Sequence, residues 1–209
     1  MSENTIHSED SGNELNHKKE NGSQLKAEIL SYLQDVVRTL AVILLVFLLL
    51  FRIVIVSGPS MNNTLMDGDY VLLINSIFYQ NHKPGDIIVA SKESFKNGEP
   101  IIKRIIATEG QVVDINFEEG LVYVDGVLQD EDYICSPTML YEGVVFPHKV
   151  PENCVFVMGD NRMNSKDSRS GEIGDIDNRQ ILGKALLLAL PGKDEITEKR
   201  QFDRIGALS

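Results

Sequence analysis

The chain has 209 residues, of which 43% are hydrophobic, and this suits one globular domain of ordinary size with appendages. Its formal net charge is −11, and residues 57–209 carry 24 acidic and 15 basic residues. Such an acidic domain is a poor candidate for binding nucleic acid, which requires a basic surface. It also gains nothing from anionic lipid headgroups, so any attachment to a membrane must be hydrophobic.

Metal and redox chemistry are not indicated by the sequence. The two cysteines, Cys135 and Cys154, form no C-x-x-C pair, and the four histidines lie far apart. This argues against a structural zinc site or a redox motif, and we predict no metal and no cofactor. We interpret both cysteines as ordinary residues of a β domain, with a disulfide as the alternative.

The N-terminal region divides into a polar tail and a hydrophobic segment. Residues 1–23 are rich in Ser, Asn, Glu and Lys and poor in aromatic residues, which predicts a disordered tail. From Gln24, apolar residues at three- and four-residue spacings predict an amphipathic helix that leads into the uncharged run Thr39–Phe51.

The hydrophobic segment has three interpretations. A cleaved signal peptide fits badly because the leader is long and acidic and no A-x-A pattern follows, and a core helix fits badly because the segment is apolar on all sides. An uncleaved transmembrane helix fits if Arg52 reaches the far interface, since Leu40–Val56 then spans about 25 Å at 1.5 Å per residue. We therefore predict a lead-in and transmembrane helix over residues 24–56. Basic residues before the run favour a cytoplasmic N-terminus, with the rest of the chain outside the cell membrane.

The chain after the span is predicted to be all-β. Short apolar runs are separated by Gly-Asp, Pro-Gly-Asp and Asp-Gly turn signals, and helical periodicity is scarce. The predicted strands are Tyr70–Ile74, Asp86–Ala90, Ile101–Ala107, Val112–Ile115, Leu121–Val124, Val127–Leu128, Val155–Met158 and Ile181–Leu190. We place a β-rich domain at residues 57–191 and a polar C-terminal tail at residues 192–209.

The stretch Ser57–Leu65, S-G-P-S-M-N-N-T-L, follows the hydrophobic segment directly. Gly and Pro favour a tight turn, which would leave the hydroxyl of Ser60 accessible while Met61 and Leu65 are buried. The alternative is an ordinary serine-rich turn after a membrane anchor.

Two cations, Lys103 and Arg104, interrupt the apolar run Ile101–Ala107. Strand alternation points them to opposite faces, so one reaches solvent and the other is directed to the core. A buried lysine loses solvation of its charged form, and its neutral amine can serve as a general base. The alternative is an edge strand with two solvated charges.

A dense polar loop, Met158–Arg169, follows a predicted buried strand. Asp167 and Arg169 are spaced to pair, and Ser165 adds a hydroxyl. A loop with so many hydrogen-bonding groups usually holds other groups in place.

Together these stretches resemble the type I signal peptidases, the membrane-bound Ser/Lys proteases that remove signal peptides from exported proteins. The resemblance runs from about Arg38 to Pro191 and rests on S-G-P-S-M-N-N-T-L, G-D-Y-V, K-R-I-I and G-D-N-R-x-N-S-x-D-S-R, in the family's order. It implies a mainly β fold with a Ser/Lys protease core of coiled antiparallel sheets. The single preceding transmembrane helix matches the short, Gram-positive-type members.

The resemblance also implies roles for the site residues. Ser60 would be the nucleophile, with its backbone N–H as an oxyanion donor, and Lys103 the general base of a Ser-Lys acyl-enzyme mechanism. Ser165 would hold the Lys103 amine. Asp167 and Arg169 would pair and buttress the loop, with Asp160 in support.

Three positions depart from the family pattern. Gly58 stands where some members carry a second serine as an oxyanion donor, and Asn63 replaces the usual proline before Thr-Leu. Glu109-Gly110-Gln111 replaces the common Pro-Gly-Asp after the lysine motif. No departure removes a catalytic group.

The substrates implied by the resemblance are preproteins with signal peptides. The peptide would add as a strand beside the serine motif and place small side chains, typically Ala, in two shallow pockets. We expect Ile55, Met61, Ile101 and Ile105 to line these pockets. The lipid bilayer would hold enzyme and substrate together.

Three other classes of protein compete with this interpretation. A silent, tethered peptide-binding domain would not need Ser60, Lys103 and Ser165 together. A self-cleaving repressor would need a DNA-binding domain, for which the first 36 residues are too short and too polar. A sortase would need a cysteine accompanied by His and Arg.

Overall fold

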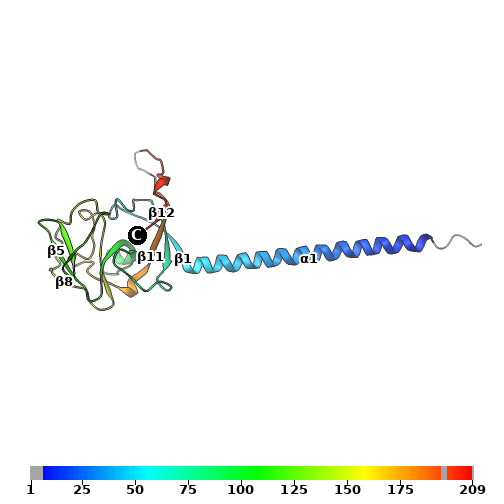
Figure 1. Cartoon of the computed structure of the whole chain (residues 1–209), viewed down its shortest axis with the longest axis horizontal. Helices are drawn as coiled ribbons and strands as arrows, with labels where there is room; N and C mark the ends of the chain where they lie inside the picture. The colour runs from blue at the N-terminus through cyan, green and yellow to red at the C-terminus, as the bar shows by residue number, and fades with distance from the viewer. Residues whose placement is uncertain (1–6, 194–196, 209) are drawn as a thin grey trace, which may run out of the picture. The chain divides into compact units, whose positions relative to one another are not determined.

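The computed structural model describes residues 7–193 and 197–208 of the chain. It consists of two compact units that divide in the sequence between Leu48 and Leu49. The first contains all but the last two residues of one long helix, α1 (His7–Leu50), and the second is built mainly from β-strands (Figure 1).

Helix α1 begins earlier than the sequence predicts. The predicted disordered tail covers residues 1–23, but the chain is helical from His7 onward, and residues 1–6 lie outside the described residues. Glu and Lys recur in this stretch and no proline occurs before Pro59, so no proline interrupts the helix.

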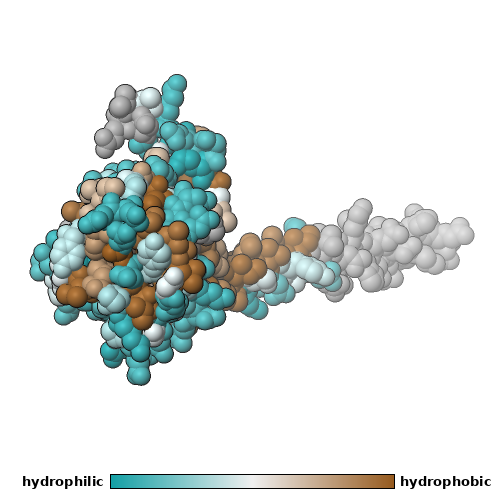
Figure 2. Space-filling model, turned by 60° about the vertical axis from the view of Figure 1, so that its left-hand side comes forward, coloured by the Kyte–Doolittle hydropathy of each residue, from teal (hydrophilic) through white to brown (hydrophobic). Residues whose placement is uncertain are grey.

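The apolar part of α1 is long enough to cross a membrane. Among the described residues, one helical segment, Glu28–Leu50, meets the length and composition of a span, with 23 residues. Hydrophobic residues gather along this part of α1 (Figure 2).

The end of the predicted span at Val56 is wrong. The helix ends at Leu50, and the following residues form strand β1 (Phe51–Ile55), which runs antiparallel to β2 (Tyr70–Asn75). The β-branched residues Ile53, Val54 and Ile55 favour this extended conformation, and Arg52 therefore lies in a strand.

The β unit contains two antiparallel sheets. The larger has eight strands in the order β1-β2-β11-β3-β4-β9-β10, with β12 paired to β11, and the smaller has four in the order β7-β6-β5-β8. Their remaining bounds are β3 (Ile87–Ala90), β4 (Ile101–Thr108), β5 (Val112–Asn116), β6 (Leu121–Val124), β7 (Val127–Leu128), β8 (His148–Lys149), β9 (Cys154–Met158), β10 (Ile176–Asp177), β11 (Ile181–Leu190) and β12 (Gly206–Ala207). Three 3-10 turns complete the described elements: η1 (Lys96–Gly98), η2 (Asn178–Gln180) and η3 (Phe202–Arg204).

The predicted all-β domain is confirmed, and every predicted strand corresponds to an observed one within two residues at each end. The large sheet curls because register shifts interrupt its ladders, for example between Ile105 and Ala107 where β4 pairs with β9. It follows that β4 lies inside the sheet, between β3 and β9.

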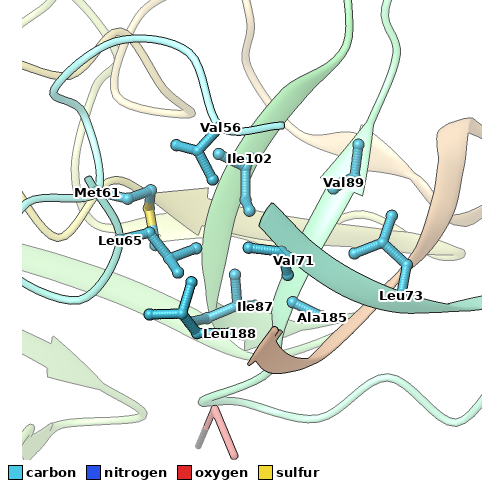
Figure 3. Close-up of a cluster of buried hydrophobic side chains, with 10 residues drawn as sticks. All are labelled: Val56, Met61, Leu65, Val71, Leu73, Ile87, Val89, Ile102, Ala185 and Leu188. Carbon is cyan, nitrogen blue, oxygen red and sulfur yellow. The ribbon is translucent and has the colours of Figure 1, made fainter. Parts of the chain in front are cut away.

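One hydrophobic cluster anchors the stretch that follows β1. Met61 and Leu65 are fully buried and pack with residues of four strands, β2, β3, β4 and β11, and with Val56 (Figure 3). The cluster comprises Val56, Met61, Leu65, Val71, Leu73, Ile87, Val89, Ile102, Ala185 and Leu188. This packing fixes residues on either side of Ser60.

The C-terminal residues do not simply form the predicted polar tail. Strand β12 pairs with β11, and Arg204 forms an ion pair with the buried Asp69 at 2.6 Å. A charged side chain that pairs with a buried carboxylate ties this stretch to the β unit.

Candidate active site

The serine turn, residues 57–69, leaves β1 and returns before β2 as a closed loop. Val56 N–H donates to the carbonyl of Asp69 at 2.8 Å, and Gly68 N–H donates to the carbonyl of Val56 at 2.9 Å. Gly58 adopts φ +85°, which favours glycine, and its N–H donates to Asp67 Oδ1 at 2.7 Å.

The predicted exposure pattern of this turn is confirmed. Ser60 is partly exposed, whereas its neighbour Met61 and Leu65 are 0% exposed. The turn therefore buries Met61 and Leu65 while Ser60, next to Met61, remains partly accessible.

Lys103 lies beside this hydroxyl. Its Nζ is 2.8 Å from Ser60 Oγ and 2.8 Å from the carbonyl oxygen of Ile102. Lys103 is 5% exposed and sits on β4, which is paired on both sides. The strand thus holds the amine against the serine turn, where burial favours the uncharged form.

The prediction that either Lys103 or Arg104 reaches solvent is wrong. Arg104 is 2% exposed because its guanidinium finds a partner on the other face of the sheet. Its Nε and Nη2 donate to the two carboxylate oxygens of Asp160 at 2.9 and 2.8 Å, and its guanidinium carbon lies 4.0 Å from the centre of the Tyr133 ring. A bidentate pair of this kind satisfies a charge that solvent does not reach.

Asp160 accepts hydrogen bonds from both β4 and the serine turn. Besides Arg104, it accepts a hydrogen bond from Thr64 Oγ1 at 2.5 Å. Asp160 was expected to support the pair of Asp167 and Arg169, but its described side-chain contacts are with Arg104 and Thr64. Instead, Asp160 connects the residue beside Lys103 with the serine turn.

The predicted pair of Asp167 and Arg169 is confirmed. Both side chains are 0% exposed, and Arg169 Nε and Nη2 donate to the two carboxylate oxygens at 2.8 and 2.9 Å. Asp167 Oδ2 also accepts from Gly159 N–H at 2.9 Å, and Arg169 Nη2 donates to the carbonyl of Arg162 at 2.8 Å. This pair fixes both ends of the polar loop.

The expected hydrogen bond between Ser165 and Lys103 is absent. Ser165 is 5% exposed, and its Oγ makes no hydrogen bond to any described residue. The hydroxyl instead lies against Gly159: a Cβ atom on this glycine would stand 2.2 Å from Ser165 Oγ and 2.5 Å from the carbonyl oxygen of Ser60. The absence of a side chain at Gly159 is what allows β9, the polar loop and the serine turn to meet.

Sequence reasoning missed a second buried arginine in the loop. Arg162 is 0% exposed, and it pairs with Glu131 at 2.6 Å and donates to Thr138 Oγ1 at 2.7 Å. Burial lowers the pKa of Arg162, but the hydrogen bonds and charge of Glu131 outweigh burial and raise it. Burial, with the charge of Glu131 next, also raises the pKa of the neighbouring Tyr133 to about 12. In the sequence, only the position of Arg162 within the polar loop indicates that this arginine could be buried and paired.

A cleft of about 610 Å³ opens beside Ser60 and Lys103. Ile55 and Ile101 line it as predicted, but Met61 and Ile105 do not, because both are buried in hydrophobic clusters. The end of β1, the start of the serine turn and the start of β4 line it, together with Phe95 and Lys166. An apolar cleft beside a hydroxyl and an amine suits an extended peptide with apolar or small side chains.

Neither a disulfide nor a metal-binding cluster is found among the described residues. Cys135 and Cys154 are both free. Within the part of the chain that the structure describes, no three His, Cys, Asp or Glu side chains gather so as to hold a metal ion.

A partly exposed serine within hydrogen-bond distance of a buried lysine, in a curled antiparallel fold, defines the class of Ser/Lys hydrolases. The family described as signal peptidase, peptidase S26, matches residues 29–190, and the chain belongs to it. It is thus a serine endopeptidase that cleaves signal peptides, and α1 is consistent with anchoring in a membrane.

Several individual proteins are similar to this chain. The probable signal peptidase I-1 of Synechocystis sp. is 37% identical over 165 residues, which are 73% of this chain and 80% of the relative. Signal peptidase I of Bacillus licheniformis is 30% identical and signal peptidase I S of Bacillus subtilis 32%, each over 83% of this chain and 95% of the relative. A crystal structure of a signal peptidase I from Enterococcus faecalis V583 is similar with a TM-score of 0.41 and 29% identity, over 50% of this chain and 96% of that chain.

Proposed function

We propose that Ser60 is the nucleophile and Lys103 the general base of this signal peptidase. The observation that supports the proposal is the 2.8 Å separation of Lys103 Nζ and Ser60 Oγ at the edge of the cleft. This distance lies within reach of direct proton transfer.

The reaction then has two halves. Ser60 Oγ attacks the scissile carbonyl carbon while the Lys103 amine takes its proton, and Lys103 returns this proton to the amine that leaves. Water next attacks the acyl-enzyme with Lys103 again as the base, which regenerates the Ser60 hydroxyl. The backbone N–H of Ser60 donates to the oxyanion.

The substrate is a signal peptide bound in extended form in the cleft. Strand β1 is an edge strand of the large sheet, so a peptide can add beside its last residues. Ile55 and Ile101 wall this place and leave room for small side chains such as Ala before the scissile bond.

The protein spans the cell membrane once, with its N-terminus in the cytoplasm and the β unit outside. Lys18, Lys19, Lys26 and Arg38 precede the hydrophobic stretch of the helix, and basic residues favour the cytoplasmic side. The lipid bilayer holds the enzyme and the apolar part of its substrate in one plane, which raises their effective concentration.

The decisive experiment is cleavage of a preprotein by the full chain and by Lys103→Arg. Arginine keeps the positive charge but does not give up its proton at ordinary pH, so we expect the variant to be as inactive as Ser60→Ala while both stay folded. Wild-type turnover should rise with pH on the acidic side as the amine loses its proton. Near-normal cleavage by Lys103→Arg would refute the Ser-Lys mechanism, and cleavage by Ser60→Ala would refute the nucleophile.

A further inference from the structure

The C-terminal segment, residues 192–193 and 197–208, lies beyond the family match, which ends at residue 190. It nevertheless contacts the base of the serine turn through Asp69. Arg204 Nη2 and Nη1 donate to Asp69 Oδ2 and Oδ1 at 2.6 and 3.1 Å, and Gly192 N–H donates to Oδ1 at 2.7 Å. The Asp69 side chain is 0% exposed and that of Arg204 is 16% exposed, so solvent screens this pair little.

Asp69 belongs equally to the serine turn. Its carboxylate accepts from Met66 N–H at 2.8 Å, and its carbonyl accepts the hydrogen bond of Val56 that closes the loop. One buried carboxylate therefore joins the turn that carries Ser60 to a segment more than 100 residues away in sequence.

Arg204 also contacts the turn directly. Its Nη2 lies 3.4 Å from the carbonyl oxygen of Thr64, and the hydroxyl of Thr64 donates to Asp160. Asp160 in turn holds Arg104, the neighbour of Lys103. Thr64 is thus held between the C-terminal segment and the strand that carries the amine.

The segment packs closely on the turn. A Cβ atom at Gly192 would stand 2.3 Å from the carbonyl oxygen of Asp67 and 2.9 Å from the carbonyl carbon of Gly68. Leu208 packs against the cluster that contains Met61 and Leu65, and its N–H donates to Leu186 at 2.9 Å. Close backbone contact, a buried ion pair and apolar packing all act on the same turn.

We propose that Arg204 is a positioning residue that holds Ser60 at the distance from Lys103 that proton transfer requires. This inference rests on the proposed roles of Ser60 and Lys103. Without Arg204, Asp69 keeps a buried charge without its cationic partner, and the turn can shift to solvate it. Catalysis is sensitive to displacements of about 1 Å in such a geometry.

The test measures kcat and KM for a signal-peptide substrate with the full chain in detergent micelles. Arg204→Ala should lower kcat about 10- to 100-fold and leave KM nearly unchanged, because Arg204 does not line the cleft. Arg204→Lys, which restores the charge but not the paired hydrogen bonds, should recover part of kcat. Lys199→Ala removes an exposed charge from the same segment and should behave as wild type.

Circular dichroism at the assay temperature separates positioning from unfolding. If Arg204→Ala is unfolded there, Arg204→Gln, which keeps a donor near Asp69, is judged by the same criterion. A folded variant with wild-type kcat, or a loss of activity that only follows the folded fraction, would overturn the inference. Activity in Ser60→Ala would instead overturn the proposed function, so the two failures are distinguishable.

Discussion

Arg169 is a residue whose importance depends on burial, and the chain contains its own control. Asp167-x-Arg169 and Asp177-x-Arg179 have the same spacing and the same bidentate hydrogen bonds, but the first pair is 0% exposed and the Arg179 side chain is 89% exposed. Burial makes an ion pair costly to break, whereas solvent replaces a surface partner.

We therefore expect Arg169→Ala to destabilise the protein by about 3–5 kcal/mol, because Asp167 keeps a buried charge without its partner. Activity should fall as well, since Asp167 also holds Gly159 N–H beside the serine turn. Arg179→Ala should change neither property measurably. Thermal unfolding and preprotein cleavage measure both, and equal effects of the two substitutions would show that the buried pair has no special role.

A substitution at Gly159 would test the close approach of β9, the polar loop and the serine turn. A methyl group there would collide with Ser165 Oγ and with the carbonyl oxygen of Ser60, so Gly159→Ala must displace the serine turn. We expect a loss of cleavage of about 100-fold in a protein that remains folded. Gly171→Ala is the matched control, because a Cβ atom at Gly171 meets nothing within 4 Å. Equal activity of both variants would contradict the described packing.

At the scale of elements, an ion pair joins two neighbouring strands. Nζ of Lys184 on β11 lies 2.5 Å from Oδ1 of Asp86, which precedes β3. Burial raises the pKa of Asp86, but hydrogen bonds from Lys184, Tyr79 and the Lys83 backbone outweigh burial and lower it. Because the folded-state pKa is depressed, this stabilisation is present above the unfolded value of about 3.9 and is lost as the pH falls through the folded value.

Lys184→Met should therefore lower the melting temperature at pH 7, by an amount equivalent to about 1 kcal/mol, and much less near pH 2. The pKa of Lys184 is raised: burial lowers it, but the hydrogen bond and charge of Asp86 outweigh burial. The contribution of Lys184 to stability is thus fully present below its unfolded-state pKa and is lost as the pH rises through its folded-state pKa.

Lys199→Met controls for the loss of an exposed lysine. A difference in melting temperature between wild type and Lys184→Met that does not change with pH would contradict a stabilising Lys184–Asp86 pair.

Some strands and site residues could be predicted from the sequence, and others could not. The long strands could be predicted because their apolar runs end at Gly and Pro turns, but β8, β10 and β12 have two residues each and carry no periodic signal. Strand β1 was missed because its Ile and Val residues continue an apolar run, and only pairing with β2 distinguishes a strand from a helix there. Ser60, Lys103 and the Asp167–Arg169 pair could be predicted from local motifs, whereas the burial of Arg104 depends on Asp160, 56 positions away.

At the scale of the whole chain, the sequence leads from one apolar helix directly into the β unit that carries Ser60. Strand β1 starts at Phe51, one residue after α1 ends, and the serine turn follows five residues of strand. In the sequence, Ser60 follows Leu50 by ten positions, so only a short stretch of chain connects the proposed nucleophile to the segment Glu28–Leu50 that is long enough to cross a membrane. This arrangement suits a substrate whose own apolar segment lies in the same membrane.

This arrangement requires the β unit and the exported substrate to be on the same side of the membrane. We predict that protease added to intact cells without their outer walls digests residues 57–209 and spares residues 1–30, because basic residues before the apolar segment favour a cytoplasmic N-terminus. Epitope tags before residue 28 and after residue 208 distinguish the two sides, and permeabilised cells are the control in which both tags are lost. Loss of the N-terminal tag alone from intact cells would reverse the topology and exclude cleavage on the outer side.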